Sequence, residues 1–394
     1  MQKKVIYLRY IPLTQKIEQD FYLRTLIDNG ICVEYWDISK LFDFVPSDLE
    51  TYESSIQIKV RKFASYKDLK DAISINRDSL FWLIMTLEPR LFRLWFILSK
   101  YNCKKIVFAN LPVAFKSAVK ASYDIFNPRL LLNRMINVLM RTLIKTGILR
   151  GYEYMFLGGS EGWRGVGLIK PSMLNTVNIL KVHSIAYNNY LKVREKHPII
   201  KGKYIVFLDQ YLPFHPDNAI CGLVPPPPDI YYSVINKALE VLERYYNIPV
   251  IIAAHPKALK YHDTNFYNGR DVIFYNTENL IVNSELVVLH NSTALSTAII
   301  SQKNILFLEA TCIEKVNKSF NDDILYLSSY LDFPCLKAES LSIELLQEIN
   351  RTTTENQFIY EDYKRCYLTS YENNSILNET LIPQIISKIF EDNE

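Results

Sequence analysis

The feature that most constrains the fold is an alternation of short apolar, β-rich runs with amphipathic helical patterns. In the first half, apolar runs at 4–10, 32–38, 80–86, 105–109 and 154–157 alternate with helical patterns at 15–28, 90–100 and 180–196. Such alternation is typical of βαβ units, in which parallel strands are joined by crossover helices. The sequence therefore predicts an α/β fold with a parallel sheet in this half.

The alternation starts again after a polar stretch at 196–203, which we interpret as an interdomain linker. Predicted strands at 204–208, 250–254, 272–275, 286–289 and 304–308 alternate with helices at 231–246, 277–283 and 293–301, and further helices are expected at 343–349 and 381–391. A chain of 394 residues also exceeds the roughly 250 to 300 residues that one hydrophobic core supports. We expect two Rossmann-like domains, over 1–200 and 201–394, with the last helix either on the flank of the second domain or crossing back to the first.

Composition narrows the class of protein. The net charge is only +3, from 45 basic and 42 acidic residues, which argues against binding nucleic acid through many phosphates. The six cysteines form no CxxC pair, so neither a zinc site nor a disulfide framework is indicated. The N-terminal apolar run is too short for a signal peptide, and acidic and basic residues interrupt the apolar stretch at 80–98. We expect a cytoplasmic protein.

A basic amphipathic helix is predicted between Pro128 and Gly151. It carries Arg129, Arg134, Arg141 and Lys145 and contains no acidic residue. One interpretation is peripheral contact with the anionic inner face of the cytoplasmic membrane, and the other is a domain helix whose cationic face is solvated. The spacing of the charges is compatible with both.

Polar residues follow four of the predicted strands in the second half. In an open parallel sheet, ligands bind beyond the carboxyl ends of the strands, so these positions are the candidates for a site. They are Asp209 and Gln210, then His255, Pro256 and Lys257, then Asn276 and Glu278, and last Asn291, Ser292 and Thr293.

Two of these clusters suit a phosphate. Asn291, Ser292 and Thr293 lead from a strand into a predicted helix, where hydroxyls and free backbone N–H groups meet a positive helix end. The same residues are also the preferred helix N-caps. Pro256 restricts His255 to extended geometry, so that its imidazole can donate to a phosphoryl oxygen. A structural histidine that caps a loop is the alternative.

Asp209 ends an apolar strand, where a carboxylate is costly to bury unless it faces a cleft. It is a candidate general base or nucleophile, with a loop-capping aspartate as the alternative. His215 and Asp217, in the same loop, and Gln210 are candidates for substrate contact. Asn276 and Glu278 are candidates for holding ribose hydroxyls, although a first-turn Glu also complements a helix dipole.

The His255-Pro256 pair, followed by Ser292-Thr293 at the start of a helix, resembles the HP and S-S/T motifs of bacterial CMP-sugar glycosyltransferases. These include sialyltransferases, polysialyltransferases and Kdo transferases. The resemblance implies the GT-B fold, in which two Rossmann-like domains face a central cleft, and it implies that His255, Ser292 and Thr293 contact CMP. The stretch from Phe207 to Gln210 is similar to the catalytic Asp region of retaining Kdo transferases, which implies that Asp209 acts at the anomeric carbon.

The sequence departs from these families in two ways. It has no Asp-Asp-Gly type motif in the N-terminal half, and the Glu often found after the Ser-Thr pair is replaced around Ser296 and Thr297. The first departure leaves inversion or retention open, and the second bears on the identity of the donor. GxGxxG, GxxxxGK[ST], GxSxG and HExxH motifs are all absent.

We therefore expect a glycosyltransferase that moves a 2-keto-3-deoxy sugar acid, of the Kdo or sialic-acid-like nonulosonic type, from a CMP donor to a bacterial capsule or lipopolysaccharide glycan. The N-terminal domain would bind the glycan acceptor, and neither a metal nor another cofactor is expected. A UDP-sugar GT-B transferase and a nucleotide-sugar 2-epimerase are alternatives. A non-catalytic glycan-assembly protein of the same fold is the alternative from another class.

Overall fold

The computed structural model describes residues 3–42, 52, 54, 58–86, 88–111, 113, 128–167, 169–216, 218, 223–352, 357–372 and 375–392. The chain divides into two compact units. Unit 1 contains the described residues up to Leu111, those from 128 to Ile185, and those from Cys366 onward, while unit 2 contains Ala186–Arg365. The sequence predicted a division at residue 200, whereas the structure divides the chain after Ile185 and returns it to unit 1 at Cys366.

Unit 1 is built on a seven-stranded parallel sheet with the order β3-β2-β1-β4-β5-β6-β7. Its strands are β1 (Lys4–Arg9), β2 (Cys32–Asp37), β3 (Lys59–Lys62), β4 (Leu80–Leu83), β5 (Lys104–Ala109), β6 (Tyr154–Leu157) and β7 (Asn178–Lys181). Its helices are α1 (Gln15–Asp20), α2 (Leu23–Asp28), α3 (Tyr66–Ile75), α4 (Phe92–Lys100), α5 (Pro128–Lys145), α6 (Pro171–Leu174) and α16 (Asn378–Glu391), with short 3-10 turns at Ser39–Leu41, Pro89–Leu91 and Gly162–Gly165.

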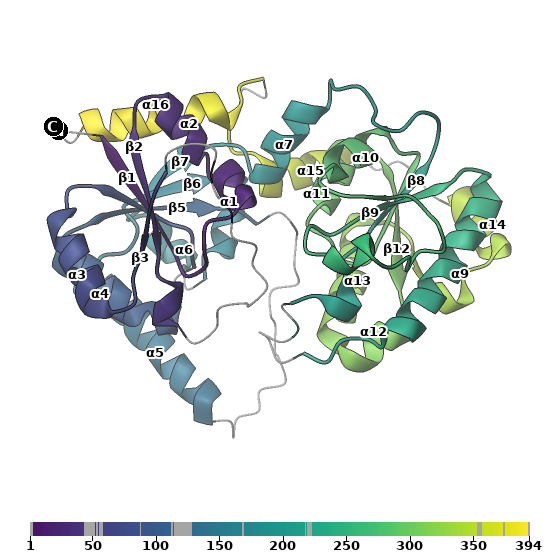
Figure 1. The fold of residues 1–394 in the computed structure, drawn as a ribbon, viewed down its shortest axis with the longest axis horizontal. Helices are drawn as coiled ribbons and strands as arrows, with labels where there is room; N and C mark the ends of the chain where they lie inside the picture. Colours follow the sequence, from purple (N-terminus) through teal and green to yellow (C-terminus); the bar gives the residue numbers. More distant parts are fainter. Residues whose placement is uncertain are drawn as a thin grey trace. The chain divides into compact units, whose positions relative to one another are not determined.

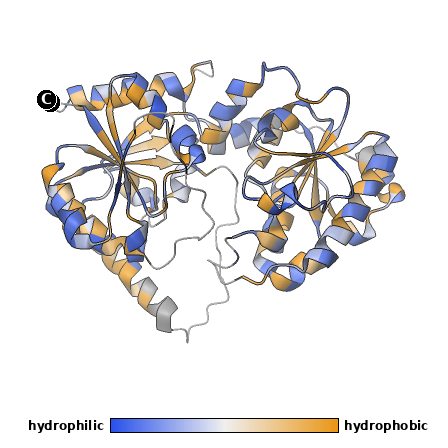
Figure 2. Ribbon diagram, in the orientation of Figure 1, coloured by the Kyte–Doolittle hydropathy of each residue, from blue (hydrophilic) through white to orange (hydrophobic). Residues whose placement is uncertain are grey.

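Helices cover both faces of this sheet (Figure 1). On one face, Leu23 and Leu26 of α2 pack with Ile382 and Ile386 of α16, so the C-terminal helix is part of the core of unit 1. On the other face, α3, α4 and α5 enclose a second core around Trp95. The strands are the most apolar elements of both units (Figure 2), as expected for a parallel sheet covered on both sides.

Buried polar groups anchor the returning C-terminal segment. The His183 ring, which is fully buried, bonds Thr369 Oγ1 through Nδ1 at 2.7 Å and the Ile376 carbonyl through Nε2 at 2.9 Å. The Asn378 side chain accepts from His183 N and donates to both His183 O and Tyr22 Oη. These bonds fix the position from which α16 starts.

Gly158 and Gly159 seat the same segment. A Cβ on Gly158 would lie 2.7 Å from the backbone of Ser184, and one on Gly159, whose φ is +106°, would lie 2.6 Å from the backbone of Cys366 and Tyr367. The close approach of three backbone segments therefore requires glycine at both positions.

Unit 2 contains a six-stranded parallel sheet with the order β10-β9-β8-β11-β12-β13. Its strands are β8 (Ile205–Leu208), β9 (Val250–Ala253), β10 (Val272–Ile273), β11 (Leu286–Leu289), β12 (Asn304–Glu309) and β13 (Cys335–Lys337). The helices of this part of the chain are α7 (Ile185–Val193), α9 (Pro228–Tyr246), α10 (Thr277–Asn283), α11 (Leu295–Ile300), α12 (Thr311–Val316), α13 (Lys318–Leu331), α14 (Ile343–Thr352) and α15 (Gln357–Tyr363), with 3-10 turns at Leu212–Phe214, Leu259–His262 and Ala338–Ser340 and a π-helical turn at Lys364–Leu368.

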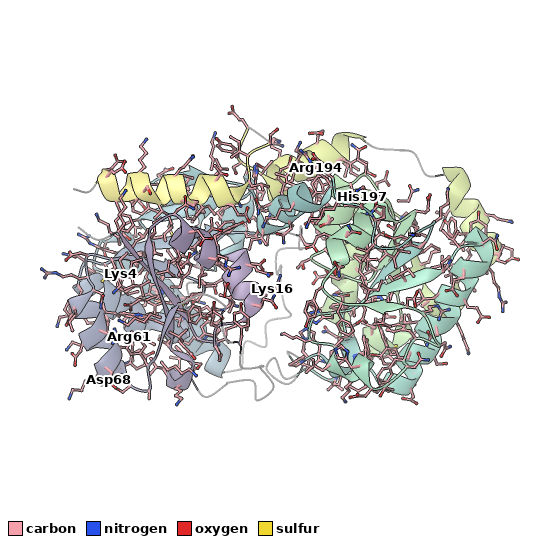
Figure 3. The ribbon with its side chains drawn as sticks, turned by 45° about the horizontal axis from the view of Figure 1, so that its top comes forward. Lys4, Lys16, Arg61, Asp68, Arg194 and His197 are labelled. Carbon is pink, nitrogen blue, oxygen red and sulfur yellow. The ribbon has the colours of Figure 1, made fainter. Side chains whose placement is uncertain are left out.

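The segment predicted as an interdomain linker, 196–203, is attached to α10. Asn279 is buried there and donates to the His197 carbonyl at 3.1 Å, while its Oδ1 accepts from Ile199 N at 3.1 Å. Figure 3 labels His197 close to the end of α7. This segment is therefore held within unit 2, and the fifteen residues 186–200 belong to it as well.

The two-domain parallel α/β architecture predicted from the sequence is confirmed. Two local predictions were wrong. The helix expected over 15–28 is broken into α1 and α2, because Tyr22 has a left-handed backbone with φ of 60°. The helix expected over 180–196 is strand β7 followed by α7. No helix among the described residues is long and apolar enough to cross a membrane.

Candidate functional site

The predicted site residues follow four neighbouring strands of unit 2. In the order β10-β9-β8-β11, Asn276 and Glu278 follow β10, His255 follows β9, Asp209 follows β8 and Asn291 follows β11. All these strands are parallel, so their carboxyl ends share one edge of the sheet. The chain passes from β8 to β9 on one side and reaches β11 on the other, which makes β8 and β11 the topological switch point where such folds bind ligands.

Gln210 joins the two loops at this switch point. Its Oε1 accepts from Asn291 N at 2.9 Å and its Nε2 donates to the Asn291 carbonyl. The side-chain amide thus pairs with the Asn291 backbone as a neighbouring strand would. Gln210, expected to contact substrate, holds the Asn291–Thr293 loop in place.

His255 has a defined tautomer. Its Nδ1 accepts a hydrogen bond from Lys257 N at 3.1 Å, so the neutral ring carries its proton on Nε2. The ring is only partly buried, and His215 lies edge-on to it with 4.8 Å between ring centroids. The structure therefore brings His215 and His255 together, with a donor nitrogen on His255.

Asp209 lies in the interior, and only 5% of it is exposed. Its Oδ1 accepts from Tyr267 Oη at 2.7 Å and from Tyr211 N at 3.1 Å, whereas Oδ2 is buried and has no hydrogen-bond partner in the part of the chain that the structure describes. Burial raises the pKa of the Asp209 carboxyl, and the bond from Tyr267 opposes that shift. The base or nucleophile role expected from the sequence stays a prediction, because the carboxylate is enclosed and its Oδ1 is already hydrogen-bonded within the protein.

The contacts of Asp209 support a positioning role. Tyr211 has a left-handed backbone with φ of 55°, and the chain then forms the 3-10 turn Leu212–Phe214 that leads to His215. The bond from Tyr211 N to Asp209 Oδ1 stabilises this sharp turn. Asp209 therefore fixes the loop that places His215 beside His255.

The hydroxyl residues after β11 lie just before helix α11 and do not cap it. Ser292 Oγ accepts from Ala294 N at 3.3 Å, and helix α11 begins at Leu295, two residues later than expected. Ser292 is half-buried, while Thr293 is exposed. The N-cap of α11 is Ala294, and no side chain of the described residues caps this helix, so Ser292 stabilises the preceding turn, while Thr293 is exposed.

The remaining predicted residues lie farther along the edge. Pro256 and Lys257 are exposed beside His255, and Asn276 is exposed with its amide on the Phe274 carbonyl at 3.1 Å. Glu278 is half-buried in the first turn of α10. Asp217 lies outside the described residues.

Tyr275 is a candidate that the sequence did not reveal. It follows β10, is 70% exposed and has a left-handed backbone with φ of 60°. A bulky residue seldom adopts this conformation, and strain of this kind concentrates at functional positions. The sequence alone places Tyr275 only at the end of the strand predicted over 272–275, with no indication of its left-handed backbone.

His290, the residue between β11 and Asn291, is buried in unit 2. It is fully buried, with Nδ1 bonded to the Leu308 carbonyl at 2.6 Å and Nε2 to Tyr231 Oη at 3.1 Å. Since a carbonyl only accepts, Nδ1 donates and Nε2 accepts from the tyrosine. Burial lowers the pKa of His290 to about 4.

This shift predicts a stability loss in mild acid. The folded-state pKa of about 4 lies below the ordinary 6.5, so the unfolded chain binds a proton first and folding stability falls as pH drops from 6.5 toward 4. At about pH 5, the protonation of His290 in the unfolded chain lowers the free energy of unfolding by about 2 kcal/mol relative to neutral pH. Urea denaturation at neutral pH and at about pH 5 should show a steeper loss for the wild type than for His290→Gln. Equal losses in the two proteins would contradict the assignment.

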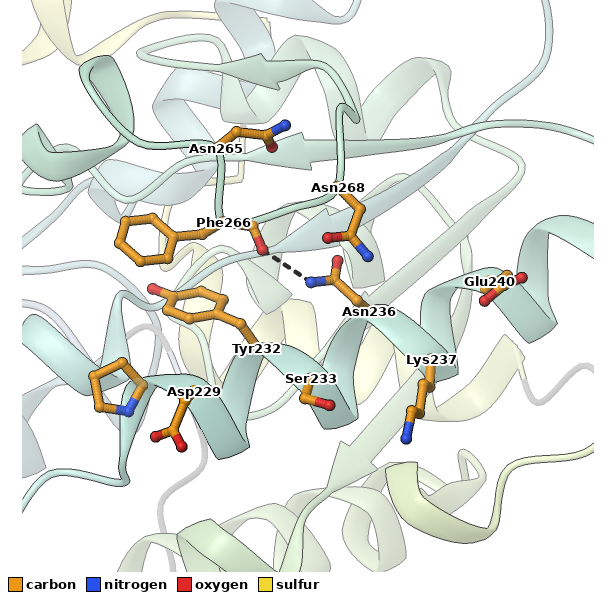
Figure 4. A pocket seen from close by; sticks show the side chains of 10 residues that line it. Asp229, Tyr232, Ser233, Asn236, Lys237, Glu240, Asn265, Phe266 and Asn268 are labelled. Atoms are coloured by element: carbon orange, nitrogen blue, oxygen red, sulfur yellow. Dashed lines mark hydrogen bonds between the residues drawn. The ribbon is translucent and has the colours of Figure 1, made fainter.

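A groove of about 720 Å³ lies elsewhere on unit 2, along α9 (Figure 4). Asn236 donates to the Phe266 carbonyl at 2.8 Å on its wall. None of the predicted site residues lines it; its lining is Pro228, Asp229, Tyr232, Ser233, Asn236, Lys237, Glu240, Asn265, Phe266 and Asn268. The groove is thus separate from the residues at the strand ends.

Unit 1 has its own switch point, between β1 and β4. Arg9 ends β1, and its Nε is buried with no hydrogen-bond partner among the described residues. Burial lowers the pKa of the guanidinium. Asn110, just after β5, also has a buried Oδ1, for which the described ranges offer no hydrogen-bond partner. Buried polar atoms are normally satisfied, so both mark this edge of unit 1 as a place for a polar ligand.

Within the described ranges, no group of three His, Cys, Asp or Glu side chains is placed to hold a metal ion. No protein-family model matches the sequence, and no curated protein matches it.

Solved structures share the fold. The wall teichoic acid polymerase TagF is similar with a TM-score of 0.54 and 12% identity, over 100% of this chain and 90% of that chain. A TagF variant soaked with CDPG is similar with a TM-score of 0.53 and 11% identity, over 100% of this chain and 90% of that chain. UGT2 of Phytolacca americana, complexed with UDP-2-fluoroglucose and pterostilbene, is similar with a TM-score of 0.51 and 7% identity, over 98% of this chain and 99% of that chain. The chain has the GT-B fold of these proteins.

Proposed function

We propose that this protein is a glycosyltransferase that takes a 2-keto-3-deoxy sugar acid, of the Kdo or nonulosonic type, from a CMP donor and transfers it to a bacterial surface glycan. The observation that supports this most directly is that His255 and the Gln210-bound Asn291–Thr293 loop follow β9 and β11, the two strands on either side of β8, at the same edge of the sheet of unit 2. The fold shared with TagF and UGT2 supports the broader class, transfer from a nucleotide-activated donor.

In this proposal His255 donates from Nε2 to the phosphate of the donor, and Thr293 and Lys257 add a hydroxyl and a charge. A positioned donor of this kind stabilises the negative charge that develops on the leaving phosphate. Because the bond from Lys257 N occupies Nδ1, the donor nitrogen is fixed before the substrate binds.

In place of Asp209, we propose His215 as the general base. It is the partly exposed titratable group in the loop after β8, and it lies against His255. A neutral imidazole at this position can accept the proton of the acceptor hydroxyl. Asp209 then acts through the loop, by keeping His215 in place.

The exposed edge of β10 offers a place for the nucleobase. Tyr275 supplies a ring that is 70% exposed, on the strand next to the one that carries His255. Stacking of a base on an aromatic ring contributes about 1–3 kcal/mol. We therefore expect Tyr275→Ala to weaken nucleotide binding by about ten-fold or more, and Tyr275→Phe to leave it nearly unchanged, in calorimetric titrations. Equal affinity of the alanine variant would remove Tyr275 from the site.

For the acceptor we propose the edge of unit 1 at Arg9 and Asn110. Arg9 Nε and Asn110 Oδ1 are buried and have no hydrogen-bond partner among the residues that the structure describes, which suits an acceptor that carries an anionic group and hydroxyls. This assignment gives unit 1 a role that its fold alone does not specify.

A UDP-sugar transferase is the second candidate, because UGT2 was solved with a UDP-sugar analogue. The assay that tests the proposal incubates the protein with CMP-Kdo, a CMP-nonulosonic acid and UDP-sugars, each with and without a mixture of bacterial glycan acceptors, and measures nucleotide release. Release of CMP that requires an acceptor supports the proposal. Release of UDP would favour the second candidate, acceptor-free conversion of a nucleotide sugar would indicate an epimerase, and no turnover would indicate a non-catalytic protein.

A further inference from the structure

Helix α5 has one buried face. Met140 is fully buried in the core of unit 1, and Ile136 and Ile144, one helical turn before and after it, pack against the same core. The helix has 18 residues and is therefore about 27 Å long. Its attachment to unit 1 leaves the rest of its surface facing outward.

The outward surface carries a stripe of apolar side chains. Leu132, Met135 and Leu139 are 56%, 63% and 49% exposed, and their spacing of three and four residues places them on one face. Val138 is 60% exposed beside them, and Ile148, just past the helix end, is 65% exposed. Soluble proteins rarely leave so many neighbouring apolar side chains uncovered unless the surface binds something.

Basic residues flank this stripe. Arg141 and Lys145 follow Val138 at helical spacing, and Lys145 is exposed, as is Arg150 after the helix. The sequence from 128 to 151 contains no acidic residue. The side chains of Arg129 and Arg134, which the sequence also singled out, lie outside the described part of the chain.

We propose that α5 docks unit 1 onto a lipid bilayer that contains anionic lipids. The apolar stripe would enter the boundary between headgroups and acyl chains, while the exposed Lys145 and Arg150 would lie at the level of the anionic headgroups. Arg141 is half-buried, with its Nε buried. The absence of acidic residues gives the charge complementarity, and the stripe runs along the helix axis, as a helix lying in the plane of a membrane requires. The assignment does not depend on the donor, and it would bring unit 1 to acceptors carried by a membrane.

The test is sedimentation of the full-length protein with vesicles of phosphatidylcholine, with and without phosphatidylglycerol. We expect binding to the anionic vesicles that weakens with salt, and little binding to the neutral ones. A Met135→Asp/Val138→Asp variant should lose at least about ten-fold in affinity, because each buried methylene contributes and a charge in the headgroup boundary opposes insertion. Lys145→Glu should weaken binding to anionic vesicles by more than about five-fold, since each basic residue near the surface contributes about five-fold and the new carboxylate is repelled by the headgroups.

Ile75→Asp is the matched control, because Ile75 is 82% exposed on α3 and should not affect vesicle binding. Thermal unfolding should be unchanged in all variants, since only exposed side chains are altered. Failure of the wild type to bind anionic vesicles, or equal binding by the wild type and the Met135→Asp/Val138→Asp variant, would overturn the proposal. The proposal would also be overturned if the Met135→Asp substitution changed the sedimentation coefficient of the protein in the absence of vesicles. That result would show that a second copy of the chain covers the stripe.

Discussion

Replacement of His255 with alanine is expected to reduce nucleotide-sugar turnover by about 100-fold or more, with the fold unchanged. The imidazole is held just after β9 with Nδ1 occupied by Lys257 N, so under the proposed function its Nε2 proton would be the group that bonds the phosphate. The side chain is only partly buried, so its removal leaves little empty space in the core. Steady-state kinetics together with thermal unfolding would separate the loss of activity from a loss of structure.

His255→Gln is the matched variant, because its amide nitrogen can donate from about the position of Nε2. We expect it to recover part of the activity that the alanine variant loses. His215→Ala should lower kcat and change the pH profile of kcat, since it removes the proposed base rather than the phosphate donor. An alanine variant at 255 with wild-type activity would show that this histidine only caps its loop.

Replacement of Asp209 with alanine is expected to lower the free energy of unfolding by about 2–4 kcal/mol. The change would remove the buried carboxylate that accepts from Tyr267 Oη and Tyr211 N. It would also loosen the turn that leads to His215, so activity should fall as well. Denaturant unfolding measures the first effect and kinetics the second.

Asp209→Asn separates a positioning role from catalysis by the carboxylate. The amide oxygen of asparagine can accept from both Tyr267 and Tyr211, so a positioning role predicts that the variant keeps a substantial part of the activity and stability. A base or nucleophile, in contrast, requires the carboxylate itself, and kcat would then fall by several orders of magnitude even though the protein stays folded. The second result would restore the role first expected from the sequence.

The fold was largely predictable because buried parallel strands have a strong sequence signal. Runs such as those that form β8, β9 and β11 are apolar throughout, and each is buried along its whole length. Strand β7 was missed because Asn178 and Lys181 are polar and the strand lies at the sheet edge, where burial selects no apolar pattern. The break at Tyr22 was missed because a left-handed tyrosine depends on tertiary contacts rather than on local preference.

The edge at which the site lies could also be predicted, since polar residues after consecutive parallel strands must gather at one edge. The roles of Asp209 and Gln210 could not. Tyr267, which binds Asp209, lies far along the chain, and Gln210 finds its partner in the loop after β11. Contacts of this kind depend on how the strands and loops pack in the folded sheet. They cannot be predicted from the identity of single residues at strand ends.

Under the proposed function, the edge of unit 2 binds the nucleotide of a CMP-activated sugar. The decisive measurement is a calorimetric and thermal-shift titration of the purified protein with CMP, CDP, UMP and UDP, because a ligand that binds only the folded state raises the unfolding temperature. We expect CMP to stabilise the wild type more than UMP or UDP does, and His255→Ala and Tyr275→Ala to reduce this effect. Preference for a uridine nucleotide, no response to any of the four, or an undiminished response in both variants would contradict it.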